Sequence, residues 1–181
     1  VREQERAARL SGVSLAACGV SVVVDGIKGD KRDGKVLFTH VGLSGPAVLN
    51  SSRAVATALA TGASVQVVLD LMPETASEVL EALLLERLIA QPNKLVRNQF
   101  TQLLPGALVV PVLEAAGVPL ETPSRSLTAA ARRQLVATVK ALAFTASHVL
   151  GLEKAIVSSG GVGLTAVEFK TMESRLVPGL Y

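Results

Sequence analysis

A strand that turns through two glycines directly into a helix is the feature that most constrains how this chain can fold. It lies between Phe38 and Leu49, where the sequence reads FTHVGLSGPAVL. Ser44-Gly45-Pro46 predicts the helix start, because a serine hydroxyl can cap the first turn and proline lacks only an N–H that has no partner there. Such a start points unpaired backbone N–H groups outward, which suits an anionic group. The same residues also fit a strand–turn–helix corner that binds no ligand, and the local sequence leaves both interpretations open.

The segments around this corner predict an α+β fold. Valine-rich runs at 18–25 and 64–71 and a mostly apolar run at 35–39 predict strands, with a charged hairpin loop over 26–34 that ends at Asp33-Gly34. Strand character returns over 144–150 and 155–159, whereas the segment between has leucines at helical spacing. We therefore expect a small antiparallel β-barrel-like domain, formed by both chain ends and interrupted by an α-helical bundle. The predicted domains are 1–72 plus 144–181 for the barrel-like part and 73–143 for the helical insertion.

Composition and charge limit the classes of partner. The chain has 181 residues, of which 49% are hydrophobic and only 3% aromatic, and its net charge is +3. The basic residues are scattered and no aromatics are interleaved with them, so we expect no nucleic-acid partner. No apolar stretch has the length of a membrane span, so we expect no membrane partner and a cytoplasmic location. The single cysteine, Cys18, excludes an internal disulfide and is expected to be a small buried apolar residue.

The residues able to carry acid–base or metal chemistry are few. His40 and His148 are the only histidines, and no Cys, His, Asp or Glu set has metal-ligand spacing, so no metal site is expected. His40, just before the glycine turn, is the candidate catalytic residue, either as an acid/base or as a substrate donor. The alternative is a structural histidine that holds the turn through its ring N–H. His148 is expected to be structural or exposed. Ser44 has no triad around it, so hydrolase chemistry is discounted.

Two long motifs carry a resemblance to a known family. The first is F-T-H-x-G-x-S-G-P-A-x-L-x-x-S over 38–52, and the second comprises Gly160-Gly161-Val162, Glu168, residues 171–175 (TMESR) and residues 179–181 (GLY). Together they resemble the aminoacetone-oxidase-like family of NAD(P)/FAD-dependent oxidoreductases. The resemblance implies a barrel-plus-helical insert between the two halves of an FAD-binding domain. The chain departs from the family in Ser158, where threonine is common, and in Phe169, where an aliphatic residue is preferred.

The resemblance also implies a cofactor, FAD, in the intact parent protein. No strand–G-x-G-x-x-G–helix fingerprint occurs in this chain, so the family's dinucleotide fingerprint is expected before Val1 and its glycine-rich continuation after Tyr181. We expect the chain alone to bind no FAD and to be inactive. Its expected partners are the FAD-binding domain of the same parent and a small-molecule substrate. The alternative is a non-enzymatic binding or assembly module that uses the helical bundle. Candidate cofactor-contacting residues are Thr39, Gly42, Ser44, Gly45, Ser158, Gly160, Gly161 and Val162.

Overall fold

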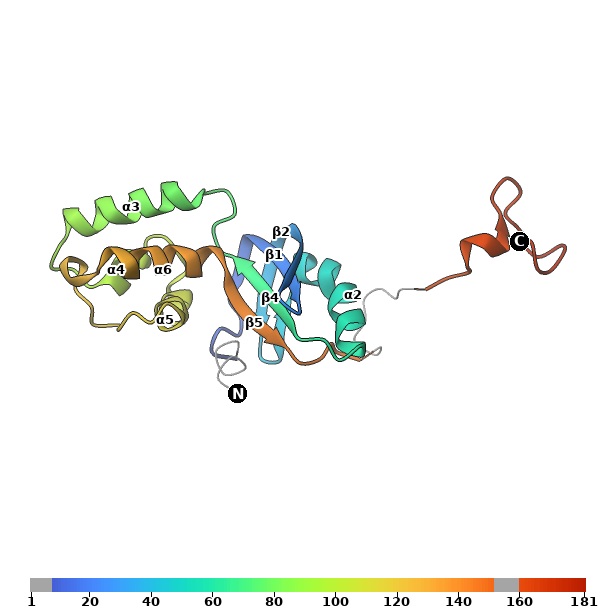
Figure 1. The fold of residues 1–181 in the computed structure, drawn as a ribbon, viewed down its shortest axis with the longest axis horizontal. Helices are drawn as coiled ribbons and strands as arrows, with labels where there is room; N and C mark the ends of the chain where they lie inside the picture. Colours follow the sequence, from blue (N-terminus) through green and yellow to red (C-terminus); the bar gives the residue numbers. More distant parts are fainter. Residues whose placement is uncertain (1–7, 152–159) are drawn as a thin grey trace. The chain divides into compact units, whose positions relative to one another are not determined.

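The computed structural model describes residues 8–151 and 160–181, which fall into two compact units (Figure 1). The first unit ends at Val149 and the second begins at Leu150. Each unit is described by itself. The predicted division into 1–72 plus 144–181 and 73–143 stays a prediction, and the predicted strand at 155–159 lies outside the described residues.

The first unit contains a five-stranded antiparallel sheet. The sequence predicts an antiparallel sheet, but not its short strand at Gly42–Ser44. Its strands lie in the order β3-β2-β1-β4-β5, so β5 closes the sheet beside β4 after the helices have intervened (Figure 1). Phe38 on β2 and Phe144 on β5 meet edge to face, with ring centroids 5.8 Å apart. Because two strands separate β2 from β5 and neighbouring strands lie about 4.8 Å apart, the sheet must curl to bring these rings together. The α+β, barrel-like fold is therefore confirmed. The strands are β1 Ser14–Val24, β2 Ile27–Thr39, β3 Gly42–Ser44, β4 Val65–Asp70 and β5 Leu142–Ala146.

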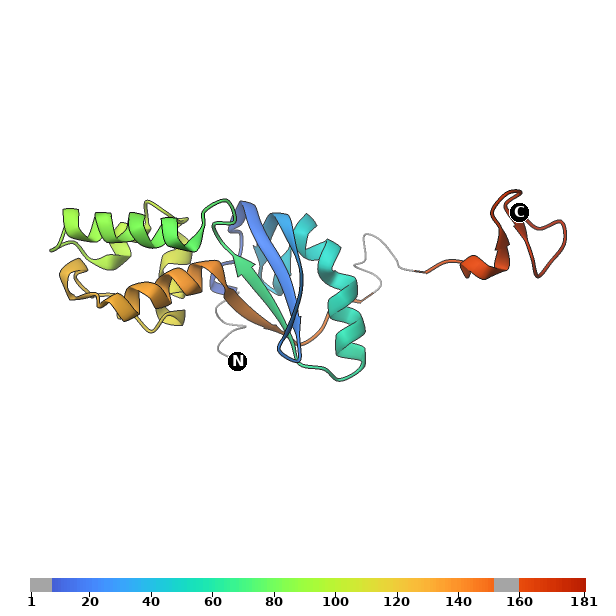
Figure 2. The same cartoon turned by 45° about the horizontal axis from the view of Figure 1, so that its top comes forward.

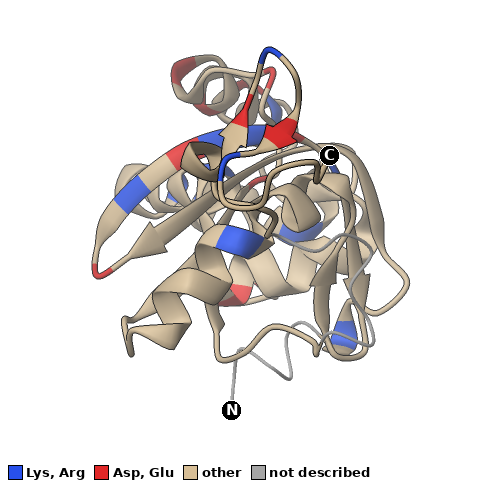
Figure 3. Cartoon of the chain, turned by 90° about the vertical axis from the view of Figure 1, so that its right-hand side faces the viewer, with Lys and Arg blue, Asp and Glu red and all other residues tan. Residues whose placement is uncertain are grey.

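The β1–β2 hairpin turns at a different Asp-Gly pair from the one predicted. Asp25 and Gly26 both have positive φ, 48° and 83°, as a two-residue type I′ turn requires. The predicted loop over 26–34 is wrong, because β2 runs through these residues and Asp33 pairs with Gly19. The charged run is thus a solvated strand, along which basic and acidic residues follow one another (Figure 3).

Helix α2, Pro46–Ala60, covers the sheet beside β1 and β2 (Figure 2). It buries Ala47, Ser51 and Val55. Pro46 stands in the first turn, as predicted, and the chain leaves the helix through Gly62, whose φ is 77°. The helix therefore fixes where the preceding β2–β3 hairpin lies on the sheet.

The helical segment between β4 and β5 has its own leucine-rich contacts. Leu80, Leu84 and Leu88 form the buried stripe of its first helix. Thr128 caps the last helix, and its hydroxyl accepts a hydrogen bond from Ala131 N at 3.1 Å. The elements are α3 Ser77–Ala90, α4 Val96–Phe100, α5 Gly106–Ala115, a 3₁₀ turn at Ser124–Ser126, and α6 Ala129–Lys140. No described helix has the length and apolar character needed to cross a membrane.

The second unit is small and folds around one short strand pair. A 3₁₀ turn at Leu164–Ala166 leads into β6, Val167–Glu168, which pairs with β7, Glu173–Ser174. Arg175 forms an ion pair with Glu168 at 3.0 Å. Most of its large apolar side chains are exposed, as expected for a segment too short to enclose a core.

Candidate functional site

The predicted corner is a tight hairpin followed directly by α2. Thr39 pairs with Gly42, so His40 and Val41 form the two-residue tip. The Thr39 hydroxyl donates to Gly42 O at 2.9 Å and so holds the tip closed. His40 is exposed, and no hydrogen bond of its ring to another described residue is present. Thr39, rather than the imidazole, is the side chain that fastens this turn.

Gly45 is required by a close approach of the chain to itself. Its φ is 101°, and a Cβ there would lie 2.6 Å from Lys35 O and 3.1 Å from Val36 Cα. Gly45 is also the residue that precedes α2, and no side chain caps this helix. The prediction that Ser44 caps α2 is therefore wrong, because Ser44 is in β3 and pairs with Leu37. Ser44 and Gly45 are half-buried, whereas Gly42 has open space where a side chain would be.

The other predicted contact residues belong to the second unit. Gly160 and Gly161 have φ values of 156° and 137°, and a Cβ at either would meet nothing within 4 Å. Val162 is 72% exposed. Ser158 lies outside the described residues. The structure thus brings Thr39, His40, Gly42, Ser44 and Gly45 together at one corner, and it describes Gly160, Gly161 and Val162 as part of a separate unit.

The corner does not by itself form a site that would hold FAD. A dinucleotide needs free N–H groups for its pyrophosphate at a helix start, and an acidic partner for its ribose. Here the first residue of α2 is Pro46, which has no N–H. The space beside Gly45 is filled by the backbone of β2, and the Thr39 hydroxyl already donates to Gly42 O. The described residues around this corner therefore do not fit the whole cofactor.

The sequence reasoning missed a cluster of charges where β4 meets the helical segment. The Asp70 carboxylate, only 12% exposed, lies 2.9 Å from Lys31 Nζ and 2.8 Å from Lys140 Nζ. It also accepts a hydrogen bond from Met72 N at 3.1 Å. Burial alone raises the pKa of Asp70, but the hydrogen bonds from Lys140, Lys31 and Met72 N outweigh it and hold the pKa below its ordinary value. The bond to Asp70 correspondingly raises the pKa of Lys31.

Gly19 explains how Lys31 reaches Asp70 across the sheet. Gly19 pairs with Asp70 on one side and with Asp33 on the other, so it separates β2 from β4. A Cβ on Gly19 would lie 2.1 Å from Lys31 Cε. The lysine stem therefore occupies the place of the missing side chain. A lone aspartate after an apolar run gave no sequence signal for this arrangement, because its partners come from distant strands and helices.

The buried cysteine is unsuited to nucleophilic catalysis. Cys18 is fully buried, as predicted, and burial raises the pKa of its thiol to about 12, so it is not an available nucleophile. Within the described residues, no three Cys, His, Asp or Glu side chains are placed to hold a metal ion.

Comparison with known proteins places this chain among related domains. Residues 1–157 match the family described as the HI0933-like protein barrel and H2TH domain. The ribosomal RNA dihydrouridine synthase of Escherichia coli K12 is 32% identical over 167 residues, which cover 92% of this chain and 39% of that protein. The protein of the same name from Haemophilus influenzae is 30% identical, over 95% of this chain and 39% of its own length.

A third relative carries another name. The 3-dehydro-bile acid delta(4,6)-reductase of Clostridium scindens is 28% identical over 148 residues, covering 82% of this chain and 36% of that protein. The chain thus spans well under half the length of the curated relatives it matches. Since the family match extends over most of the chain and the curled sheet with its helical segment fits the description, this chain belongs to the family of HI0933-like protein barrel and H2TH domains.

Proposed function

We propose that this chain is the substrate-side insert of an FAD-dependent reductase, covering the flavin of a dinucleotide-binding domain located elsewhere in the parent protein. The observation that carries the proposal is the match of residues 1–157 to one family, in a chain that covers 39% of two relatives named as dihydrouridine synthases. The corner's inability to hold a whole dinucleotide supports a division of labour, in which another domain binds FAD.

The relatives' names suggest the class of reaction. A dihydrouridine synthase and a delta(4,6)-reductase both add hydrogen across a carbon–carbon double bond of a ring. In uridine and in a 3-dehydro steroid that bond is conjugated with a carbonyl group. We infer that the parent delivers one hydride and one proton to such a bond. In that reaction, this chain orients the ring, excludes water and supplies the proton.

His40 is the group at the corner that can supply a proton. It is exposed at the hairpin tip, and its ring is not engaged by another described residue. Its place is fixed on both sides, by the Thr39–Gly42 bond and by Gly45. A group held this way is ready to meet a substrate that arrives from another domain. Thr39, Gly42, Ser44, Gly45, Ser158, Gly160, Gly161 and Val162 are the proposed contacts to the flavin edge or substrate.

The test uses the intact parent protein with its flavin bound. We expect His40→Ala to reduce turnover of an unsaturated ring substrate by roughly 10²- to 10⁴-fold, the range for a lost acid/base group. Flavin content and the melting temperature should stay close to those of the unchanged protein. His148→Ala is the matched control, because His148 is also exposed but bonds to Ser147 through its ring Nδ1. Equal activity of both variants would remove His40 from the mechanism.

The same preparation separates the proposal from its rival. A non-enzymatic binding or assembly module would be recovered without flavin and would show no reductant-dependent bleaching of a flavin spectrum. A parent protein that carries stoichiometric flavin, and oxidises a nicotinamide in step with loss of the substrate double bond, supports the reductase. A parent without bound flavin would overturn it.

A further inference from the structure

Two loops of the helical segment are joined into one structure, which we call the double loop (residues 91–97 and 121–126). Three backbone hydrogen bonds connect them: Val96 N to Thr122 O at 2.9 Å, Ser124 N to Lys94 O at 2.8 Å, and Arg125 N to Pro92 O at 2.9 Å. Figures 1 and 2 show it at the end of the helical segment that lies farthest from the sheet. The first loop follows α3 and the second precedes α6.

A buried polar contact makes the double loop rigid. Ser124 is 3% exposed and donates through its hydroxyl to Lys94 O at 2.7 Å. Beneath it lies Gln99, 2% exposed, whose amide donates to Arg87 O at 3.3 Å and reaches Ser124 Oγ at 3.5 Å. The two loops are hydrogen-bonded to each other and to the buried Ser124–Gln99 contact. The backbone that carries their charged side chains is therefore held in place.

The charged side chains of the double loop are mainly basic; Arg125 is exposed, and Lys94 and Arg97 are half-buried. Lys94, Arg97 and Arg125 are its cations, and Glu121 is its single acid. Glu121 pairs with Arg97 at 2.8 Å, and Arg125 donates to the Asn93 amide oxygen. The Lys94 ammonium has no partner among the described residues. The fold has therefore gathered a net positive charge from residues that are scattered in the sequence.

We propose that the double loop contacts the phosphodiester backbone of a structured RNA. The inference rests on the proposed function, because two relatives are named for action on ribosomal RNA. Its charge complements phosphate, and arginine and lysine are the residues that bind it. A membrane surface or a protein interface would call for exposed apolar or aromatic side chains, and the double loop exposes no large ones.

The lack of aromatic residues also defines the mode of contact. Without rings on which bases stack, the double loop is suited to the shape and backbone of a folded RNA rather than to a base sequence. The expectation of no nucleic-acid partner rested on the same lack of aromatics and on scattered basic residues. The scattering of basic residues in the sequence does not hold for the fold at the double loop, because pairing between the loops brings Lys94 and Arg125 together.

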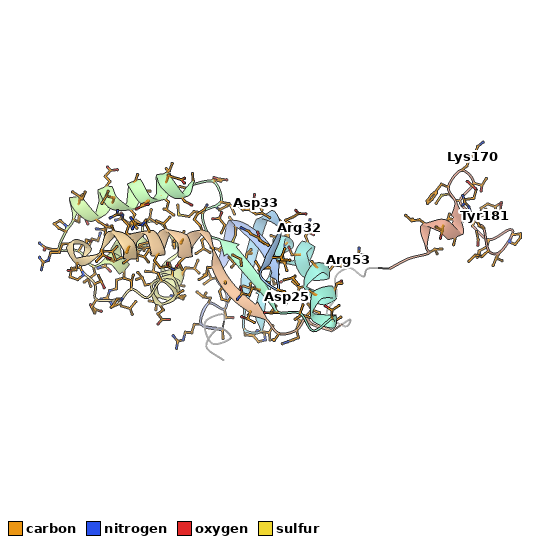
Figure 4. The ribbon with its side chains drawn as sticks, in the orientation of Figure 1. Asp25, Arg32, Asp33, Arg53, Lys170 and Tyr181 are labelled. Carbon is orange, nitrogen blue, oxygen red and sulfur yellow. The ribbon has the colours of Figure 1, made fainter. Side chains whose placement is uncertain are left out.

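The experiment measures binding of this chain to a fluorescein-labelled RNA hairpin with a uridine-rich loop, by fluorescence anisotropy. We expect Lys94→Gln/Arg125→Gln to raise Kd by at least about tenfold near 100 mM KCl, and to reduce the salt slope by about 0.7–0.9 for each lost phosphate contact. Lys28→Gln/Arg32→Gln is the matched control, because it removes the same charge from β2 of the sheet. Figure 4 labels Arg32 on this strand. The control should bind as the unchanged chain does.

Each other outcome counts against the proposal. If both double variants weaken RNA binding equally, net charge alone is responsible for the binding. If the unchanged chain does not bind the RNA in the micromolar range, the proposal that the double loop contacts RNA is overturned. If the double variant loses its circular dichroism spectrum, Lys94→Gln alone decides, since its ammonium bonds to no described residue. That single change should raise Kd severalfold and reduce the slope by about 0.7–0.9.

The intact parent keeps this failure distinct from failure of the proposed function. There the Lys94→Gln/Arg125→Gln variant should keep its flavin and its reduction by a nicotinamide, while KM for RNA rises. A parent that reduces only small unsaturated rings, and whose chain binds no RNA, would leave the reductase standing and overturn the double loop. If the chain binds RNA through the double loop but the parent carries no flavin, the double-loop proposal stands and the proposed reductase is overturned.

Discussion

At the scale of single residues, Gly45 shows why the corner has a glycine before α2. Both its positive φ and the Lys35 carbonyl, 2.6 Å from the position of a Cβ, exclude a side chain. We expect Gly45→Ala to lower the free energy of unfolding by roughly 2–4 kcal/mol, because strain at a positive φ adds to a backbone clash. Gly62→Ala is the control, with φ 77° but open space around it, and should cost only about 1 kcal/mol. Urea unfolding of both measures the difference, and equal losses would show that φ alone requires Gly45.

Asp70 makes stability depend on pH at the same scale. Its pKa is lower in the folded chain than in the unfolded chain, so the unfolded chain takes up a proton first as pH falls. The stabilisation by the ionised carboxylate is therefore complete above about pH 5 and is lost as pH drops below about 4. Urea unfolding from about pH 5 to below about pH 4 should show the loss, and Asp70→Asn should flatten that part of the curve. An unchanged slope in the variant would assign the acid sensitivity to other carboxylates.

At the scale of elements, one ammonium joins the two connections between the sheet and the helical segment. Lys140, at the end of α6, donates to Met72 O at 2.7 Å and Thr75 O at 2.8 Å in the β4–α3 connection, and also pairs with Asp70. The backbone bond from Leu71 N to Val139 O, 2.9 Å, lies beside it. The cluster thus determines how the helical segment leaves the sheet and returns to it.

Removing that ammonium should loosen the connection before it unfolds the chain. We expect Lys140→Met to cost roughly 1–3 kcal/mol, the value of charge-assisted bonds lost from a mostly buried group. Amide hydrogen exchange should rise first over residues 71–76. Lys35→Met, an exposed change on β2, should alter neither quantity. Uniform exchange changes across the chain would mean that Lys140 contributes only to global stability.

The elements also show what the sequence could and could not predict. Alternating valines and spaced leucines located the strands and helices, because these patterns follow from which face is buried. The prediction of a turn at Asp33-Gly34 is wrong because Asp25-Gly26 is an equally good local signal, and only the pairing of β1 with β2 decides between them. The prediction of a Ser44 cap is wrong because the pairing of Ser44 in β3 with Leu37 is not local. Both the charge cluster at Asp70 and the double loop depend on distant segments, so no local pattern could reveal them.

At the scale of the whole molecule, the division of labour can be tested on this chain alone. We expect it to purify colourless and to quench no FAD fluorescence at micromolar concentrations, because α2 begins at Pro46, which has no N–H, and the backbone of β2 fills the space beside Gly45. The parent protein, measured in parallel, should carry the flavin. Stoichiometric flavin on the chain alone would show that the cofactor site lies within it.

The edge-to-face pair of Phe38 and Phe144 has a consequence for the order of events during synthesis. Phe144 emerges from the ribosome only after the whole helical segment, so until then β4 is an unpaired sheet edge with the apolar residues Val65, Val67 and Leu69. Pairs so distant in sequence form slowly, because a long loop must close first. A nascent chain that stalls before Leu142 would present this edge to other chains, and aggregation is the expected result.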